Sequence, residues 1–100
     1  MKARKKPIVI DYFDPSGKTY KDLALWLKSF NQKLSDYFGS DEEIDGNSPL
    51  NNSLYVKTLE GKSYNVTDDD YIIRGIKGEF YPHKKDIFQD AYDKIDDDND

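Results

Sequence analysis

Two strand–turn–strand patterns in the second half of the chain limit most strongly how it can fold. The first, LYVKTLEGKSYNVT, covers residues 54–67. A two-residue turn at Glu60-Gly61 would place its apolar residues opposite polar ones, and the face that should cover a core would be lost. A three-residue loop, Leu59 to Gly61, with Gly61 at positive φ, avoids this. It predicts a hairpin whose apolar face consists of Leu54, Val56, Tyr64 and Val66.

The second pattern, YIIRGIKGEFYP, covers residues 71–82 and predicts a hairpin that turns about Lys77-Gly78. Apolar side chains then occupy both of its faces. This arrangement is typical of strands at the centre of a sheet or beneath a terminal helix. One predicted face carries Tyr71, Ile73 and Phe80, and the other carries Ile72, Arg74, Ile76 and Tyr81.

The first half of the chain predicts one strand and one long helix. KPIVIDYF, residues 6–13, is rich in β-branched and aromatic residues and is followed by the turn sequence DPSG. Thr19 with Asp22 then forms a capping arrangement, and an apolar stripe at three- and four-residue steps runs to Gly39. We expect an amphipathic helix of about five turns, with Trp26 packed at the edge of its stripe. The stripe consists of Leu23, Leu27, Phe30, Leu34 and Phe38.

A short helix is predicted near the C-terminus, with Asp86 as its candidate cap. Its apolar positions are Ile87, Phe88, Ala91, Tyr92 and Ile95. The expected fold class is α+β: a small antiparallel sheet, made of the first strand plus the two hairpins, packs with one long amphipathic helix and a short C-terminal helix. Residues 1–95 form a single domain with a basic N-terminal arm (1–6) and a long loop (40–53), and residues 96–100 form an acidic disordered tail.

Charge is unevenly distributed along the chain. The net charge is −5 at pH 7, and without the four cations of the N-terminal arm it is −9. Those cations are Lys2, Arg4, Lys5 and Lys6. An acidic body repels phosphate backbones and favours association with basic surfaces. The alternative is that the acidity only keeps a small protein soluble.

Cysteine is absent, which excludes disulfides, thiolate metal sites and a cysteine nucleophile, and is compatible with a reducing cytosol. The basic start is followed by the short apolar run PIVI, which is far shorter than a signal peptide or a membrane span requires. We therefore expect a cytoplasmic protein that begins at or near Met1 and does not associate with a membrane.

A run of three carboxylates precedes the second hairpin, although a turn needs only one. The run is either solvated charge or a concentration of negative charge that meets the arginines of a partner. Tyrosine gives a large contact area at low entropic cost, so tyrosines off the apolar faces, Tyr37 among them, are candidate contacts. The predicted partner-binding residues are Asp68, Asp69, Asp70, Glu79, Tyr81, Tyr55, Asp41, Glu42 and Glu43.

No metal, cofactor or catalytic residue is predicted. The start of a calcium-loop pattern is present at Asp41, Glu43, Asp45 and Gly46. However, Asn52 stands where that loop needs a bidentate glutamate, and a strand follows where a helix should. The single histidine, His83, has no oriented nucleophile in the sequence, so we interpret it as part of a connector between strand and helix.

Three segments, MKARKKPIVI, YVKTLEG and YIIRGIKGEFYPHKKDIFQDAY, together resemble a family of small phage and prophage proteins. Members of that family open with a basic RKKP strand and end with a segment such as GDYIIRGVKGEFYPCKPDIFEKTYE. The match leaves out residues 16–53. This chain has Asp70 where the family often has glycine, and His83-Lys84-Lys85 where it often has Cys-x-Pro. The resemblance implies a bacteriophage origin and a bacterial cytoplasmic setting, and transfers no catalytic residue.

Two functions then compete. The first is inhibition of a host defence nuclease, as anti-CRISPR proteins do when they occupy the basic channel of an RNA-guided enzyme of the Cas9 type, which an acidic body complements. Its partner would be a host protein with a basic nucleic-acid-binding surface. The second is a phage accessory role in which the arm of Lys2, Arg4, Lys5 and Lys6 binds nucleic acid or a nucleotide. An enzyme is not expected.

Overall fold

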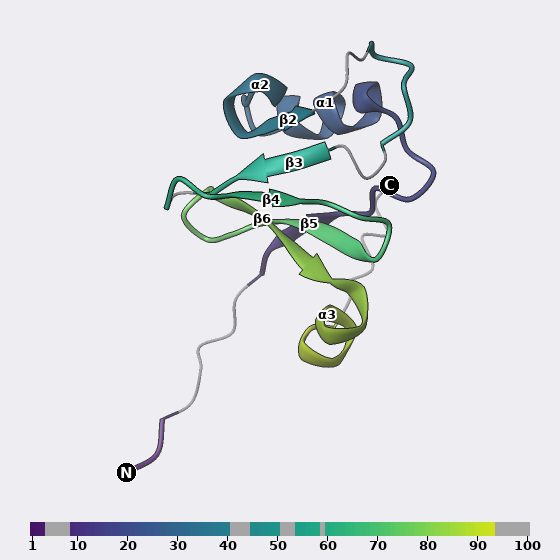
Figure 1. The fold of residues 1–100 in the computed structure, drawn as a ribbon. Coiled ribbons are helices and arrows are strands. Elements are labelled where there is room, and N and C mark those ends of the chain that lie inside the picture. The colour runs from purple at the N-terminus through teal and green to yellow at the C-terminus, as the bar shows by residue number, and fades with distance from the viewer. Residues whose placement is uncertain (4–8, 41–44, 51–53, 59, 94–100) are drawn as a thin grey trace.

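The strands form two antiparallel sheets of three strands each, and helices lie on both sides of them (Figure 1). The computed structural model describes residues 1–3, 9–40, 45–50, 54–58 and 60–93. The first sheet has the order β1 (Asp11–Phe13), β5 (Asp70–Arg74), β6 (Phe80–Lys84), and the second β2 (Phe38–Ser40), β3 (Leu54–Lys57), β4 (Ser63–Asn65). The helices are α1 (Tyr20–Lys28), α2 (Leu34–Tyr37) and α3 (Lys85–Ala91). The α+β class is confirmed, but the strands form two sheets where one was predicted.

The β3–β4 hairpin has the predicted register. Val56 pairs with Tyr64, and the Thr58 N–H donates to the Lys62 carbonyl at 2.8 Å, which closes a three-residue loop. Gly61 has a φ of 83°, the left-handed conformation that glycine adopts without strain. The apolar face is only partly buried, because Tyr64 remains 43% exposed while Leu54, Val56 and Val66 are buried.

The β5–β6 hairpin has a different register from the one predicted. The Gly75 N–H donates to the Glu79 carbonyl at 2.8 Å, and Gly78 has a φ of 79°, so the loop contains three residues, as in the first hairpin. Ile73 therefore pairs with Tyr81 and Arg74 with Phe80. The predicted faces were wrong for β6. The prediction assumed a two-residue turn at Lys77-Gly78, and a change of one residue in the length of the loop moves every side chain of the following strand to the opposite face.

The two faces of the first sheet contact separate apolar clusters. One face, with Ile72 and Phe80, packs in the larger cluster with α1 and the second sheet. The other face, with Tyr71 and Ile73, packs against Phe88 of α3. Strand β5 is thus buried on both faces at the centre of its sheet, in agreement with the apolar pattern of its sequence.

Helix α1 begins where the sequence indicates, at a capping box. The Asp22 N–H donates to Thr19 Oγ1 at 3.3 Å, and the Thr19 N–H donates to Asp22 Oδ2 at 2.9 Å. Two further amides of the first turn lie between Thr19 and Asp22 and have no acceptor within the helix. The Tyr20 N–H donates to the Ser48 carbonyl, and the Lys21 N–H donates to the Gly46 carbonyl. The described part of the predicted 40–53 loop therefore closes the N-terminal end of α1.

The prediction of one long helix to residue 38 is wrong. Asn31 has a φ of 61°, its N–H donates to the Lys28 carbonyl, and the Gln32 N–H donates to the Leu27 carbonyl. This pair of hydrogen bonds is the Schellman motif, which ends a helix. The later stripe residues still pack on the core, Leu34 from α2 and Phe38 from β2. Helical spacing was preserved across the break, which is why the periodicity alone gave no sign of it.

Three smaller boundaries also differ from the prediction. Strand β1 begins at Asp11, because β5 ends at Arg74, its pairing partner. Residues 6–8 of the predicted strand and residues 4–6 of the predicted arm lie outside the described residues. Helix α3 begins at Lys85, so Asp86 lies in its first turn and does not cap it. Ile95, the 96–100 tail and residues 41–44 and 51–53 of the loop also lie outside the described residues. Among the helices of the described ranges, none has the length and apolar character to span a membrane.

Candidate interaction surface

The three consecutive aspartates differ sharply in their surroundings. Asp70 is only 5% exposed. Its Oδ2 accepts hydrogen bonds from the N–H and the hydroxyl of Thr67, at 2.9 and 3.1 Å, and its Oδ1 lies 3.5 Å from Lys84 Nζ. Asp70 thus holds the turn into β5, and the expectation that it presents free charge together with its two neighbours is wrong for this residue.

Asp68 and Asp69 are exposed, but their backbone is fixed. The Asp69 carbonyl accepts a hydrogen bond from the Lys85 N–H at 2.8 Å, and the Asp68 carbonyl accepts one from Ser16 Oγ at 3.3 Å. The first contact ties the turn to the start of α3, and the second ties it to the segment before α1. The two carboxylates therefore stand in solvent on a positioned backbone.

The two lysines beside this turn are held by internal partners. Lys84 Nζ faces Asp70, and Lys85 Nζ lies 2.8 Å from Asp14 Oδ1 and donates to Ser16 Oγ at 2.9 Å. Burial by itself would raise the pKa of Asp14, but the Lys85 hydrogen bond, the Ser16 N–H and the Lys85 charge hold that pKa below its usual value. The Lys85 ammonium is therefore closely paired within the fold, whereas the Lys84 ammonium lies near Asp70 but remains 56% exposed.

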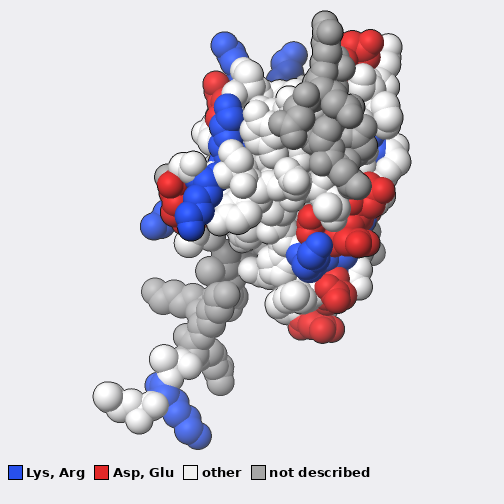
Figure 2. Space-filling view, in the orientation of Figure 1, with Lys and Arg blue, Asp and Glu red and all other residues white. Residues whose placement is uncertain are grey.

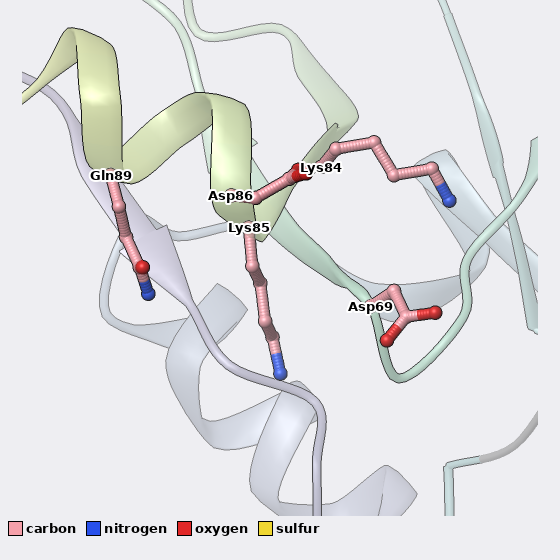
Figure 3. Close-up of a pocket in the computed structure, with 5 residues that line it drawn as sticks. All are labelled: Asp69, Lys84, Lys85, Asp86 and Gln89. Carbon is pink, nitrogen blue, oxygen red and sulfur yellow. The ribbon is translucent and has the colours of Figure 1, made fainter.

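A hollow of about 470 Å³ lies between the turn and α3 (Figure 3). Its wall residues come from the turn before β5, the end of β6 and the first turns of α3; they are Asp69, Lys84, Lys85, Asp86 and Gln89. In Figure 3 the Lys85 side chain runs between Gln89 on one side and Asp69 on the other. The Gln89 amide nitrogen donates to the Tyr71 hydroxyl at 3.3 Å, which fixes the direction of its side chain.

Three exposed carboxylates remain around this hollow, and we call Asp68, Asp69 and Asp86 the acidic surface. Within the described parts of the chain, none of the three forms an ion pair. Asp86 uses one oxygen to accept the Ile87 N–H at 2.8 Å. Figure 2 shows red side chains gathered around a blue group at the right-hand edge, and mainly blue side chains with some red ones among them at the opposite edge.

Glu79 and Tyr81 were predicted to share a surface with the aspartates, but the register separates them. Asp70 pairs with Lys84 at one end of the hairpin, whereas Glu79 closes the loop at the other end. Lys84 and Glu79 are five residues apart along the strand, a distance of about 17 Å. Burial, followed by the neighbouring Tyr92 and the Glu79 carboxylate, raises the pKa of Tyr81. Glu79 and Tyr81 line their own smaller hollow of about 170 Å³, with Thr58, Glu60 and Phe80.

The other predicted contact residues that the structure describes do not join the acidic surface. Tyr55 is half-buried, and its ring lies against Gly39 of the neighbouring strand, where no side chain could fit. Tyr37 packs against Phe80 with ring centroids 5.0 Å apart, so it belongs to the core and not to an exposed contact set. Asp41, Glu42 and Glu43 lie outside the described residues.

The polar residues considered for metal binding or catalysis have local roles. Asp45 Oδ1 accepts hydrogen bonds from the Asn47 N–H and the Ser48 hydroxyl and so stabilises its own turn. His83 Nδ1 lies 3.1 Å from the Lys84 carbonyl, and its ring packs edge-on against Phe88. In the described ranges, no three His, Asp or Glu side chains come together in a way that could hold a metal ion.

No protein-family model, curated protein or solved structure matches this chain. The resemblance to phage proteins therefore remains a prediction from the sequence.

Asp86 and Gln89, which line the hollow with Asp69, were not among the predicted contact residues. The signal that could have found them is the hairpin register, since the pairing of Asp70 with Lys84 places the start of α3 directly beside the aspartate turn.

Proposed function

We propose that this protein is a small phage-encoded inhibitor of a host defence nuclease of the RNA-guided type. Its acidic surface binds the basic surface with which that enzyme holds nucleic acid. The observation that carries the proposal is the contrast in pairing: Lys84 and Lys85 are engaged by Asp70 and Asp14, whereas the carboxylates of the acidic surface form no ion pair with any described residue. Beside the turn, the three exposed carboxylates outnumber the one exposed ammonium, that of Lys84, so the local charge is negative.

The physical basis is electrostatic complementarity. Carboxylates on a fixed backbone attract a basic groove over a distance, and on contact they accept charge-assisted hydrogen bonds from arginine. Because the backbone of Asp68 and Asp69 is already held by Ser16 and Lys85, little ordering entropy is lost when they bind. The same charges repel the phosphate backbone that the enzyme would otherwise hold.

The test compares two variants of equal net charge. The first changes Asp68, Asp69 and Asp86 to asparagine, and the control changes three exposed carboxylates elsewhere, Asp11→Asn, Asp36→Asn and Glu60→Gln. Both are titrated into a purified Cas9-type nuclease while its binding to target DNA is measured. We expect the first variant to inhibit about tenfold less well and with a flatter salt dependence, and the control to resemble the wild type. Equal inhibition by all three proteins would overturn the proposal.

A nucleic-acid accessory role is the second candidate, and the exposure of the first three residues of the chain is the observation in its favour. Met1, Lys2 and Ala3 are exposed and stand away from the body (Figure 1). A gel shift with duplex and single-stranded DNA separates the two functions. Since the body is acidic, we expect no complex at physiological salt. A submicromolar, salt-sensitive complex that is lost when residues 1–6 are removed would replace the inhibitor proposal with the accessory role.

A further inference from the structure

The guanidinium group of Arg74, the last residue of β5, has no hydrogen bond or ion pair with any described residue. Its Nε atom is buried nonetheless. We propose that the accessible edge of this group binds a carboxylate side chain of a protein partner. Arg74 lies at the closed end of the β5–β6 hairpin, whereas the acidic surface lies at the open end, so the inference does not depend on the proposed function.

An aromatic ring holds the guanidinium group in place. Its central carbon lies over the Phe30 ring, 4.5 Å from the ring centroid. Phe30 is itself positioned, because its N–H donates to the Leu27 carbonyl at 3.0 Å and its ring meets the Trp26 ring edge-on at 5.3 Å. The face of a ring attracts a cation, but it does not accept the hydrogen bonds that the edge of a guanidinium group can donate. Phe30 therefore positions the Arg74 group and leaves its donors unused.

The accessible edge is the one formed by the two Nη atoms. Nε is the buried nitrogen of the group, whereas Arg74 as a whole is half-buried, so a ligand reaches the Nη atoms. Gly78 lies next to Nη2, since a Cβ atom at that glycine would be 3.7 Å away. The two Nη atoms form a planar fork, which a carboxylate matches with two parallel hydrogen bonds.

The carboxylates nearest along the backbone do not occupy this fork. Asp11 pairs with Arg74 across the β1–β5 ladder, but its side chain is exposed and no ion pair joins these two residues. Glu79, in the hairpin loop, accepts the Lys77 N–H at 3.0 Å and likewise forms no ion pair with Arg74. A part-buried cation without a hydrogen bond or a counter-charge is unfavourable. An anion at the fork supplies what the described fold does not.

A carboxylate fits this position better than the phosphates of a nucleic acid do. Asp11 and Glu79 border Arg74 with negative charge, and they repel a phosphate backbone more strongly than a single carboxylate. The surroundings are those of a protein interface, in which arginine and aromatic residues contribute most of the binding energy. Trp26 and Phe30 are both half-buried, so they keep apolar surface for contact beside the guanidinium group.

The binding experiment uses the whole chain, labelled with ¹⁵N, and three short peptides with blocked ends. The peptides differ only at a central glutamate, glutamine or phosphoserine. Titrations are followed by the Nε–Hε signal of Arg74, which is assigned by its loss in Arg74→Lys. We expect the glutamate peptide to shift this signal and to bind about fivefold or more tightly than the glutamine peptide, and at least as tightly as the phosphoserine peptide. Lys57→Met, which removes an exposed cation elsewhere, should leave the titration unchanged.

Equal affinity for glutamate and glutamine would overturn the inference, and tighter binding of phosphoserine would assign the site to phosphate instead. The melting temperature of the isolated chain gives a second test. Arg74→Met keeps an apolar side chain against Phe30 and removes the unmatched charge, so we expect a rise of about 3 °C together with loss of glutamate-peptide binding. Asp11→Asn should stay within about 1 °C of the wild type. A lower melting temperature in either variant would overturn the inference, because it would show that the fold already satisfies the guanidinium group.

Discussion

The two ends of the β5–β6 hairpin both carry carboxylates, yet those carboxylates have different tasks. At the closed end, Glu79 Oε1 accepts the Lys77 N–H at 3.0 Å, and the carboxylate lies against Gly75, so it stabilises the loop. At the open end, Asp70 has the same kind of task toward Thr67, while Asp68 and Asp69 have no described partner for their side chains. Of these carboxylates, only those of Asp68 and Asp69, at the open end, have no hydrogen-bond partner among the described residues.

The comparison shows that a run of like charges is not one functional unit. What separates Asp70 from Asp69 is the backbone N–H and hydroxyl of Thr67, three residues earlier, which Asp70 alone accepts. An acidic residue whose oxygens are already bonded contributes to stability, whereas one whose oxygens face water contributes to association. The predictions below separate these two contributions.

The largest expected effect is on stability, from Asp70→Ala. The change removes two hydrogen bonds to Thr67 and the contact with Lys84, and it leaves a part-buried N–H without a partner. We expect the free energy of unfolding to fall by about 2–3 kcal/mol in urea titrations. Asp69→Ala is the matched control and should change it by less than about 0.5 kcal/mol. Similar losses of stability in the two variants would contradict the conclusion that Asp70 stabilises the fold and Asp69 does not.

A second effect should be shared by both hairpins. Gly61 and Gly78 have φ values of 83° and 79°. A Cβ atom at Gly61 would have no neighbour within 4 Å, and one at Gly78 would lie 3.7 Å from Arg74 Nη2. The cost of a substitution is therefore backbone strain alone, and we expect Gly61→Val and Gly78→Val each to lose about 1–3 kcal/mol. Thermal melts of the two variants test this. An unchanged melting temperature for either variant would contradict the three-residue loop at that position.

A smaller effect concerns pH and the lysine that borders the acidic surface. Because the folded pKa of Asp14 lies below its usual value of 3.8, its contribution to stability is present above that pH and is lost as the pH falls through the lower folded value. Asp14→Asn removes the contribution, so unfolding free energies measured below about pH 4 should depend less steeply on pH than those of the wild type. The same slope in both proteins would show that Lys85 does not stabilise the Asp14 carboxylate.

The sequence predicted those parts of the fold that local chemistry determines. The Thr19–Asp22 capping box, the positive φ of Gly61 and the register of the first hairpin depend on a few neighbouring residues, and they are confirmed. The end of α1 was missed because Asn31 is a much weaker signal than glycine for a left-handed residue. The register of the second hairpin was predicted wrongly because both of its faces are apolar. Either register therefore places apolar side chains on a buried face, and the sequence pattern does not distinguish them.

The candidate site was predictable only in part, for a related reason. Asp68 and Asp69 were visible as a charge run, but the burial of Asp70 depends on a hydrogen bond that the composition of the turn does not reveal. The roles of Lys84 and Lys85 depend on Asp70 and on Asp14, which is distant in sequence. Without that pairing, the Lys84-Lys85 dipeptide suggests a basic surface, whereas in the fold each of the two lysines lies beside a carboxylate.

The most direct measurement of the central claim compares binding and stability in one pair of variants. One variant carries asparagine at Asp68, Asp69 and Asp86, and the other is Asp70→Asn. Affinity for the Cas9-type nuclease is measured by surface plasmon resonance at several salt concentrations, and unfolding free energy by urea titration. We predict that the first variant binds about tenfold more weakly with stability within about 0.5 kcal/mol of the wild type. The second should be less stable by about 1–2 kcal/mol with nearly unchanged affinity while it remains folded. Wild-type affinity and salt dependence in the first variant would contradict the claim that these carboxylates form the interaction surface.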